Sequence, residues 1–312
     1  MLPSSDVIHF KPTISPAGRL ARLGVVIDAT VAPARASGLA RLCDRAGIDI
    51  VWLGGIGPSA GDAVDWGDVL AELAAVDATV GRARIGISLP DRELSALRTD
   101  LPAAPAEVCL TRRYRASDRA DLLRDWYPVG ENLDRPRFSV VLSDLAELAD
   151  WLALVDDVVL PGWLFRDLET AADEIRAECA ESGRDPATLG VGVLVPVSVG
   201  RTAAEAVARA EMDPGLARFG HPSETGIFGT LEECQDRVIA FAHAGVTDLR
   251  CILPGTPDIH DVIAQLTAIT LGSIAVLQPG ALRSEAPPPP AGWGGRPARP
   301  PSQRVSAGSR RR

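Results

Sequence analysis

The sequence is poor in lysine, histidine and aromatic residues, and it has no long apolar segment. Lys11 is the one lysine among 32 basic residues, the chain has four histidines, and aromatic residues make up 4% of its 312 residues. No uninterrupted apolar run approaches the roughly 18 residues that a membrane-spanning helix needs. The first residues also lack the charged-then-apolar order of a secretory signal. We therefore expect no membrane partner.

The five cysteines predict neither disulfides nor a zinc site. Their number is odd, none are close in sequence, and no C-x-x-C spacing occurs. Cys43, Cys179 and Cys234 fall on the apolar faces of expected helices, where cysteine acts as a small apolar residue. This usage favours a reducing cytoplasm. No pair of histidines or carboxylates has metal-ligand spacing, so we expect no metal.

The net charge of −9 is unevenly spread. Residues 283–312 carry seven arginines and one glutamate, a net +6, which leaves −15 on the rest of the chain. An acidic body argues against nucleic acid as a partner, because phosphate contacts dominate that affinity. Pro, Gly, Ser and Arg dominate residues 283–312, which predicts a disordered tail. We expect an N-terminal arm over residues 1–19 and one domain over residues 20–282.

A repeated unit runs through the expected domain: an apolar helical stripe, a glycine, then an apolar strand. "RAGIDIVWL" (45–53) and "HAGVTDLRCIL" (243–253) each place Ala-Gly between a stripe and a strand. "GVGVLVPVSV" (190–199) is apolar throughout, which is typical of a parallel strand buried on both faces. The apolar segments predict eight strands, at about 22–27, 49–53, 83–89, 106–111, 138–142, 156–160, 190–199 and 247–253.

Eight strand–helix units in this length predict a TIM (β/α)8 barrel with an irregular fourth unit, since residues 112–137 are polar. A doubly wound open sheet is the alternative, because it shows the same alternation. The first strand leads into "VVIDATVAP" (25–33) instead of a G-x-G-x-x-G turn, which favours the barrel. The sequence has no P-loop or G-x-S-x-G elbow, so nucleotide and serine hydrolysis lack support.

Two loops after late strands lead into helices that have their own caps. Thr202 with Glu205, and Thr230 with Glu233, have the spacing of a capping box. Phosphate sites in TIM barrels favour such loops. Helix capping accounts for both threonines, and we prefer that interpretation.

Active sites of TIM barrels lie at the carboxyl ends of the strands, which selects four substrate-pocket candidates. Asp28 follows the first strand, Thr111 and Arg112 follow the fourth, and Trp163 follows the sixth. Arg112 would bind a phosphate or carboxylate, and Trp163 would stack on a planar ring. The structural alternatives are a turn cap at Asp28, a solvated loop at Arg112 and a core rim at Trp163.

His221 is the best-placed histidine for acid–base chemistry. It lies in "RFGHPSETG" (218–226), a loop of the kind that covers a barrel mouth. A surface histidine beside a proline is the alternative.

Five segments, in this order and spacing, resemble the luciferase-like monooxygenase family. "LARLCDRAGIDIVWLG" (39–54) resembles its first helix and second strand. "ESGRDPATLGVGVLVPVSVGRTAAEA" (181–206) resembles its late strand, and "GTLEECQDRVIAFAHAGVTDLRCILPG" (229–255) resembles its closing module. Residues 74–89 and 135–162 resemble the third unit and the fifth and sixth units. The resemblance implies a TIM barrel that uses FMN or a deazaflavin coenzyme for monooxygenation or hydride transfer.

The resemblance covers most of residues 20–272 and implies positions for the coenzyme. Ser88–Leu89 matches the end of the third strand, where the family often has a non-proline cis peptide bond beneath the flavin ring. Ser143 and Asp144 match the turn that helps to hold the phosphate, and Gly162 follows the sixth strand. Ser143 would also cap the following helix, whose free N–H groups suit an anion. A small-molecule substrate and a homodimer are further implications.

Two departures from the family keep a second function open. Gly54 and Gly55 stand where deazaflavin members commonly place an acid and a histidine. The fourth unit, "CLTRRYRAS" (109–117), lacks the usual glycines. The sequence thus predicts a flavin- or deazaflavin-dependent oxidoreductase acting on a small organic substrate. The alternative is a catalytically degenerate barrel that binds a ligand or a partner.

Overall fold

The computed structural model describes residues 22–27, 33–54, 84–89, 107–110, 137–221, 225–254 and 261–269. The predicted arm (1–19) and tail (283–312) lie outside the described residues. Within them, nine parallel strands are present. Their bounds are β1 Arg22–Ile27, β2 Ile50–Leu53, β3 Arg84–Leu89, β4 Glu107–Leu110, β5 Arg137–Val141, β6 Asp157–Pro161, β7 Gly190–Val199, β8 Ile227–Gly229 and β9 Asp248–Ile252.

Eight of these strands close into a ring, which confirms the predicted TIM barrel and excludes the open sheet. Each strand from β1 to β7 pairs with the next, and β9 lies between β7 and β1. Asp248 of β9 pairs with Arg22 on one side and with Gly192 on the other, so no edge remains open at this seam. All eight predicted strands are therefore present, with bounds that differ by at most two residues.

The ten-residue strand β7 has two roles. Its first part, up to Leu194, pairs with β6, and residues Gly192–Pro196 pair with β9. Its last part, Val197–Val199, extends beyond the ring and pairs with the short strand β8, which we did not predict. The backbone N–H of Gly200 donates to the carbonyl oxygen of Gly229 at 2.9 Å, so the chain between these glycines leaves and returns at one place.

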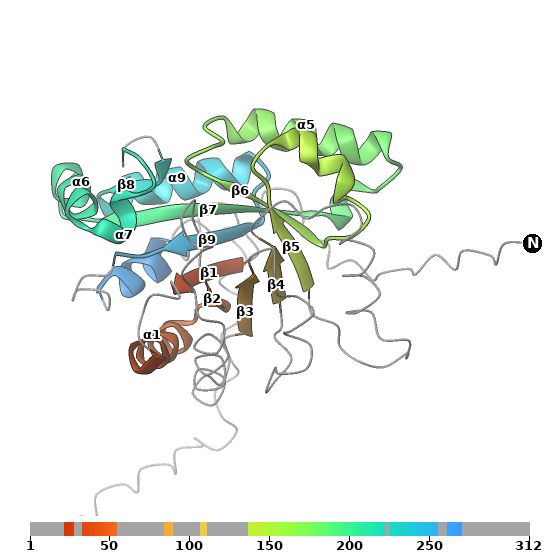
Figure 1. The fold of residues 1–312 in the computed structure, drawn as a ribbon. Helices are drawn as coiled ribbons and strands as arrows, with labels where there is room; N and C mark the ends of the chain where they lie inside the picture. Colours follow the sequence, from red (N-terminus) through yellow and green to blue (C-terminus); the bar gives the residue numbers. More distant parts are fainter. Residues whose placement is uncertain are drawn as a thin grey trace, which may run out of the picture.

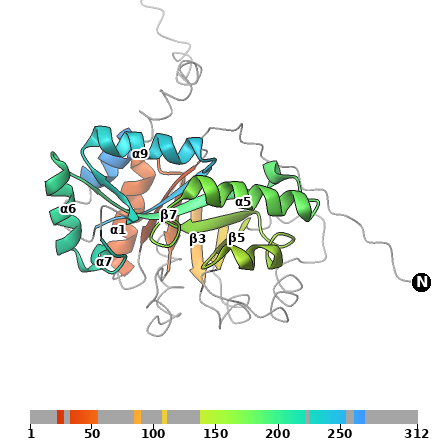
Figure 2. The ribbon, with the colours of Figure 1, turned by 90° about the horizontal axis from the view of Figure 1, so that it is seen from above.

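The helices lie outside the ring and cover it. Figure 1 shows α5 and α9 along one side, over β6 and β7, and α1 on the opposite side, near β1 and β2. Figure 2 shows α5 and α9 following the length of β7. The helix bounds are α1 Pro33–Ala46, η1 Leu145–Asp150, α5 Leu168–Glu181, η2 Pro186–Thr188, α6 Ala203–Met212, α7 Pro214–Ala217 and α9 Leu231–His243, followed by a helix at 261–269.

The glycines predicted to end three helices do so in the left-handed conformation. Gly47, Gly183 and Gly245 have φ values of 79°, 75° and 95°, which side chains with a Cβ rarely adopt. Each is followed by the strand that the repeated unit predicted. The predicted apolar stripes of α5 and α9 are buried except at Leu231, which is 41% exposed. In the α1 stripe Cys43 is buried, whereas Leu39, Leu42 and Ala46 are only partly buried.

The outer core fills the layer between the ring and the helices. Helix residues such as Ala40, Ile175 and Val238 pack there against alternate residues of the strands. Cys43, Cys179 and Cys234 are buried in the same layer, as predicted. Burial raises the pKa of the Cys43 and Cys234 thiols to about 12, so they act as apolar residues.

The two predicted capping boxes differ. At α9, Thr230 Oγ1 accepts from the Glu233 N–H, and the Glu233 carboxylate accepts from the Thr230 N–H, which confirms the box. At α6, Thr202 accepts from the Glu205 N–H, but the Glu205 carboxylate accepts from Arg201 instead. A capping box needs the Thr202 N–H, but the Glu205 carboxylate binds the N–H of the preceding residue, Arg201, and also the Arg201 side chain. No helix of the described residues has the length and apolarity to cross a bilayer.

Candidate active site at the carboxyl end of the barrel

Alternate residues of each strand face the barrel interior, which we call the lumen. In β2, Ile50 and Trp52 belong to the inner apolar cluster, whereas Val51 and Leu53 belong to the outer core. The same alternation recurs around the ring. The lumen cluster consists of Val26, Ile50, Trp52, Cys109, Val159, Leu194, Ala210, Leu216, Phe219 and Ile252.

Charged side chains close the amino end of the lumen. Six strands begin with a charged residue, and ion pairs connect all six. Three arginines balance three carboxylates in this group. We call it the amino-end ring, and its members are Arg22, Arg84, Glu107, Arg137, Asp157 and Asp248.

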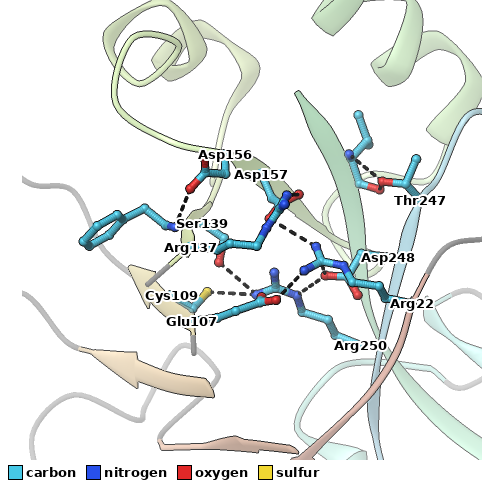
Figure 3. A network of polar contacts seen from close by, with 12 residues as sticks. Arg22, Glu107, Cys109, Arg137, Ser139, Asp156, Asp157, Thr247, Asp248 and Arg250 are labelled. Carbon is cyan, nitrogen blue, oxygen red and sulfur yellow. Dashed lines mark hydrogen bonds and ion pairs between the residues drawn. The ribbon is translucent and has the colours of Figure 1, made fainter. Parts of the chain in front are cut away.

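Arg22 is the centre of the amino-end ring. Its guanidinium pairs with Glu107, with Asp157 at 3.1 Å and with Asp248 at 3.4 Å, as Figure 3 shows. Arg137 binds Asp157 through two nitrogens, at 2.8 and 3.1 Å. The three carboxylates have side chains at most 1% exposed, so these pairs satisfy charges that burial would otherwise penalise.

Burial and pairing act against each other on the carboxylates of this ring. Burial alone would raise the pKa of Asp157, but Arg22 and Arg137 outweigh it and lower that pKa. At Glu107 burial dominates, and Arg22 offsets it only in part, so the pKa of Glu107 is raised. Because each charge in this ring has a partner, we interpret the amino-end ring as a structural feature that closes this end of the barrel.

One layer above the ring, a buried arginine supports a tryptophan. Arg250 is 1% exposed, and its Cζ lies 3.9 Å from the centroid of the Trp52 ring. The guanidinium also donates to Asp248 at 2.8 Å, to Ser139 at 3.1 Å and to the Cys109 sulfur at 3.2 Å (Figure 3). These contacts fix the indole across the middle of the lumen.

Two glycines make room for that indole. A Cβ on Gly86 of β3 would lie 2.5 Å from Trp52 Cε3, and a Cβ on Gly24 of β1 would lie 3.1 Å from Trp52 Nε1. Trp52 on β2 stands between these strands. A side chain at Gly86 would therefore collide with the ring.

Above Trp52, the carboxyl end of the lumen is apolar; we call it the mouth. Val26, Leu194 and Ile252 are buried there, and three further side chains are only partly buried. These are Val141 of β5, Trp163 after β6 and Phe228 of β8. The described part of the mouth thus offers apolar and aromatic surface, which is the usual lining of a site for an organic ligand.

Helix α7 inserts into one side of the mouth. Leu216 and Phe219 are 2% and 3% exposed and belong to the lumen cluster, although they lie outside the ring's strands. Buried Asp213 holds the helix in place, since its carboxylate accepts from the Gly215 and Leu216 N–H groups. Figure 1 shows α6, α7 and β8 grouped at the tip of β7.

Trp163 packs against the lumen cluster and has an aromatic neighbour, whereas its role toward a ligand stays a prediction. The Trp163 and Phe219 ring centroids are 4.5 Å apart, with planes tilted by 40°. The Gly162 N–H donates to the carbonyl oxygen of Leu194 at 2.8 Å. A Cβ on Gly162 would lie 2.7 Å from Val195 Cγ1. Packing alone therefore explains a glycine at 162, and its role toward a coenzyme stays a prediction.

The predicted coenzyme residues of β3 and β5 lie at the carboxyl end of the ring. Ser88 and Leu89 end β3 and pair with Cys109 and Leu110, but the described residues contain no cis peptide bond, so the implied cis bond is wrong for this structure. Ser143 is exposed and is not the helix cap.

Asp144, not Ser143, caps the short helix η1. The Asp144 carboxylate accepts from the Ala146 N–H at 3.0 Å. Asp144 has the extended backbone that a cap requires, so the carboxylate one residue later takes the N–H we assigned to Ser143. A coenzyme phosphate at Ser143 stays a prediction and would lie beside this negative charge.

His221 lies at the exposed end of the α7 segment. Its side chain is 59% exposed, and Nε2 lies 3.7 Å from Glu211 Oε1. It follows Phe219, a member of the lumen cluster, by two residues. Asp28, Thr111 and Arg112 lie outside the described residues, and no group of three metal-ligating side chains occurs among those described.

Sequence reasoning missed the amino-end ring, Arg250 and Phe219. The ring had a visible signal, because a charged residue opens six of the apolar strands. Arg250 also interrupts an apolar strand, "DLRCI". Phe219 had no such signal, since its place in the mouth depends on how α7 folds back.

Comparison with known proteins supports the fold. No protein-family model matches the sequence, and no curated protein matches it. Solved structures do match. An F420-dependent secondary alcohol dehydrogenase in complex with an F420–acetone adduct is 14% identical, with 82% of this chain and 99% of that chain covered and a TM-score of 0.61.

Two further structures match over similar lengths. A long-chain alkane monooxygenase is 10% identical, with 83% of this chain and 92% of that one covered and a TM-score of 0.61. The coenzyme F420-dependent tetrahydromethanopterin reductase of Methanopyrus kandleri is 13% identical, with 81% and 99% covered and a TM-score of 0.57. The predicted TIM barrel is thus confirmed, because this chain shares the fold of these solved structures.

Proposed function

We propose that this protein is a flavin- or deazaflavin-dependent oxidoreductase that acts on a small organic substrate at the mouth of the barrel. The observation that carries the proposal is the polarity of the lumen. Its paired charges lie at the amino end, and partly buried aromatic and apolar side chains lie at the carboxyl end. The fold is shared with oxidoreductases that use F420.

The mouth fits the ring of such a coenzyme better than it fits the phosphate. Trp163, Phe228 and Val141 offer apolar surface to a planar ring. The N-termini of α6 and α9 already hold Glu205 and Glu233, which would repel a phosphate. The turn at Ser143 is the remaining predicted place for the phosphate, beside the cap at Asp144.

A bound flavin or deazaflavin would supply hydride transfer or oxygen activation. The protein's own residues have other tasks. The end of β3 at Ser88–Leu89 would support the ring. The apolar mouth would orient the substrate and exclude water from the reacting atoms. His221 is the candidate to exchange a proton with solvent, since its imidazole is exposed and it follows Phe219 by two residues.

Titration of the full-length protein with FMN, riboflavin and F420, followed by coenzyme fluorescence, tests the proposal. We expect saturable binding of FMN or F420. Binding of neither would contradict the oxidoreductase.

The variant Asp144→Asn locates the phosphate. Asparagine still caps η1, but it removes a negative charge next to Ser143. If the phosphate lies there, the variant should bind FMN about two- to fivefold more tightly, with no change for riboflavin. Asp173→Asn on the exposed face of α5 makes the same change of charge away from the mouth, and should change neither affinity.

A catalytically degenerate barrel that binds a ligand or a partner is the second candidate. One observation favours it: Gly54, with a φ of 130°, follows β2 where the resemblance implies an acid or a histidine. This candidate predicts that the protein binds an organic ligand but neither FMN nor F420, so the same titration separates the two.

A further inference from the structure

We propose that Phe219 and Trp163 form a wall that limits the size of the substrate group that this mouth accepts. The proposal deepens the proposed function and rests on it, since it takes the mouth as the substrate-binding end of the barrel.

The wall is built from two elements that meet only in the folded chain. Trp163 follows β6, and Phe219 follows α7, yet their ring centroids are 4.5 Å apart. Phe219 is 3% exposed, whereas Trp163 is partly buried. One side of the indole therefore rests on Phe219, and the remaining accessible part is left for a ligand.

Phe219 is held firmly in this position. Leu216, one turn earlier, is buried in the same cluster, and Asp213 caps α7 through two backbone N–H groups. On the other side, the Arg218 guanidinium lies 4.8 Å from the centre of the Phe219 ring. Because the ring is packed from several sides, it limits the space beside Trp163 instead of moving aside.

An NMR titration of the full-length protein with benzyl alcohol tests whether a ligand contacts the wall. The Trp163 indole N–H signal, assigned with Trp163→Phe, reports binding. The Trp151 signal is the internal reference, because Trp151 is 1% exposed in the outer core. We expect benzyl alcohol to shift the Trp163 signal and not the Trp151 signal; a Trp163 signal that does not move would overturn the wall.

The size limit is tested with 2-naphthalenemethanol and the variant Phe219→Ala. Removing the phenyl ring opens space beside Trp163, so the affinity for the naphthyl probe relative to benzyl alcohol should rise by about tenfold. Leu164→Ala, beside Trp163 but 52% exposed, should leave this ratio unchanged. An unchanged ratio in a folded Phe219→Ala protein would overturn the size limit. If that variant does not fold, Phe219→Leu tests the same point with a smaller expected rise.

The coenzyme titration keeps this inference distinct from the proposed function. Probe binding at Trp163 without binding of FMN or F420 would contradict the oxidoreductase and leave the wall in place. Coenzyme binding with a Trp163 signal that no probe shifts would contradict the wall alone. Competition between FMN and benzyl alcohol would assign the wall to the coenzyme and overturn its role toward substrate.

Discussion

At the scale of single residues, the lumen is organised by where side chains are missing as much as by where they are present. Trp52 fits across the barrel because its neighbours on β1 and β3 are Gly24 and Gly86. Gly190 of β7 leaves room for the Asp157 carboxylate in the same way. A sequence shows these glycines but not what they face, so their role could not be predicted.

Gly86→Ala and Gly38→Ala form a matched pair. In the first, the new Cβ would meet Trp52 Cε3 at 2.5 Å, and we expect a loss of about 1–3 kcal/mol in the free energy of unfolding. In the second, an exposed position of α1 has nothing within 4 Å, so the protein should gain about 0.5–1 kcal/mol. Urea unfolding followed by circular dichroism measures both, and equal effects would contradict this account of the lumen.

At the scale of elements, local chemistry made most of the barrel predictable. Continuous apolar runs indicated β7, and glycines with positive φ ended α1, α5 and α9 where the sequence placed them. The strand β8 was missed because it has three residues and only one neighbouring strand. At η1 the prediction chose Ser143 over Asp144, since both residue types cap helices and the sequence does not show which backbone is extended.

Thr230→Ala tests how much the capping box contributes to α9. The substitution removes the acceptor of the Glu233 N–H, so we expect a loss of about 1 kcal/mol in the free energy of unfolding. Glu232→Ala, in the same turn but outside the box, should cost no more than about 0.5 kcal/mol. A thermal or urea unfolding series that ranks them the other way would contradict the role of the box.

At the scale of the whole molecule, the sequence predicted the ring but not the walls of its mouth. Eight strands with helices between them indicate a closed barrel. The amino-end ring also has a signal in the sequence, because six strands begin with a charged residue. The mouth depends on contacts between distant elements. Trp163 was a candidate from its place after β6, whereas Phe219 and Phe228 reach the mouth through α7 and β8, which no periodicity predicted.

The amino-end ring gives the molecule a pH-dependent stability. The folded pKa of Asp157 is below its ordinary value of 3.8, so its stabilising contribution is present above that pH and is lost as the pH falls through the folded pKa. Asp157→Asn should lose about 3–5 kcal/mol at neutral pH and should show a shallower decline below pH 3.8 than the wild type. Unfolding free energies measured across the acid range, with Asp173→Asn as the exposed control, check this.

The pH dependence of stability that Glu107 contributes has the opposite sign. Its folded pKa is above its ordinary value of 4.5, so its contribution is present below that pH and is lost as the pH rises through the folded pKa. Glu107→Gln should therefore be less harmful at neutral pH than Asp157→Asn. The same unfolding series measures this order, and a larger loss for Glu107→Gln would contradict it.

The hydrogen bond between Gly200 and Gly229 means that the segment between them leaves the barrel and rejoins it at one place. The eight-stranded ring closes below that place, through the first part of β7 and β9. A different segment inserted between these two glycines would replace α6, α7, β8 and Phe219 together. The strand register of the eight-stranded ring would stay the same. Because Leu216 and Phe219 of this segment pack into the lumen cluster, any replacement must supply its own apolar side chains at these two places.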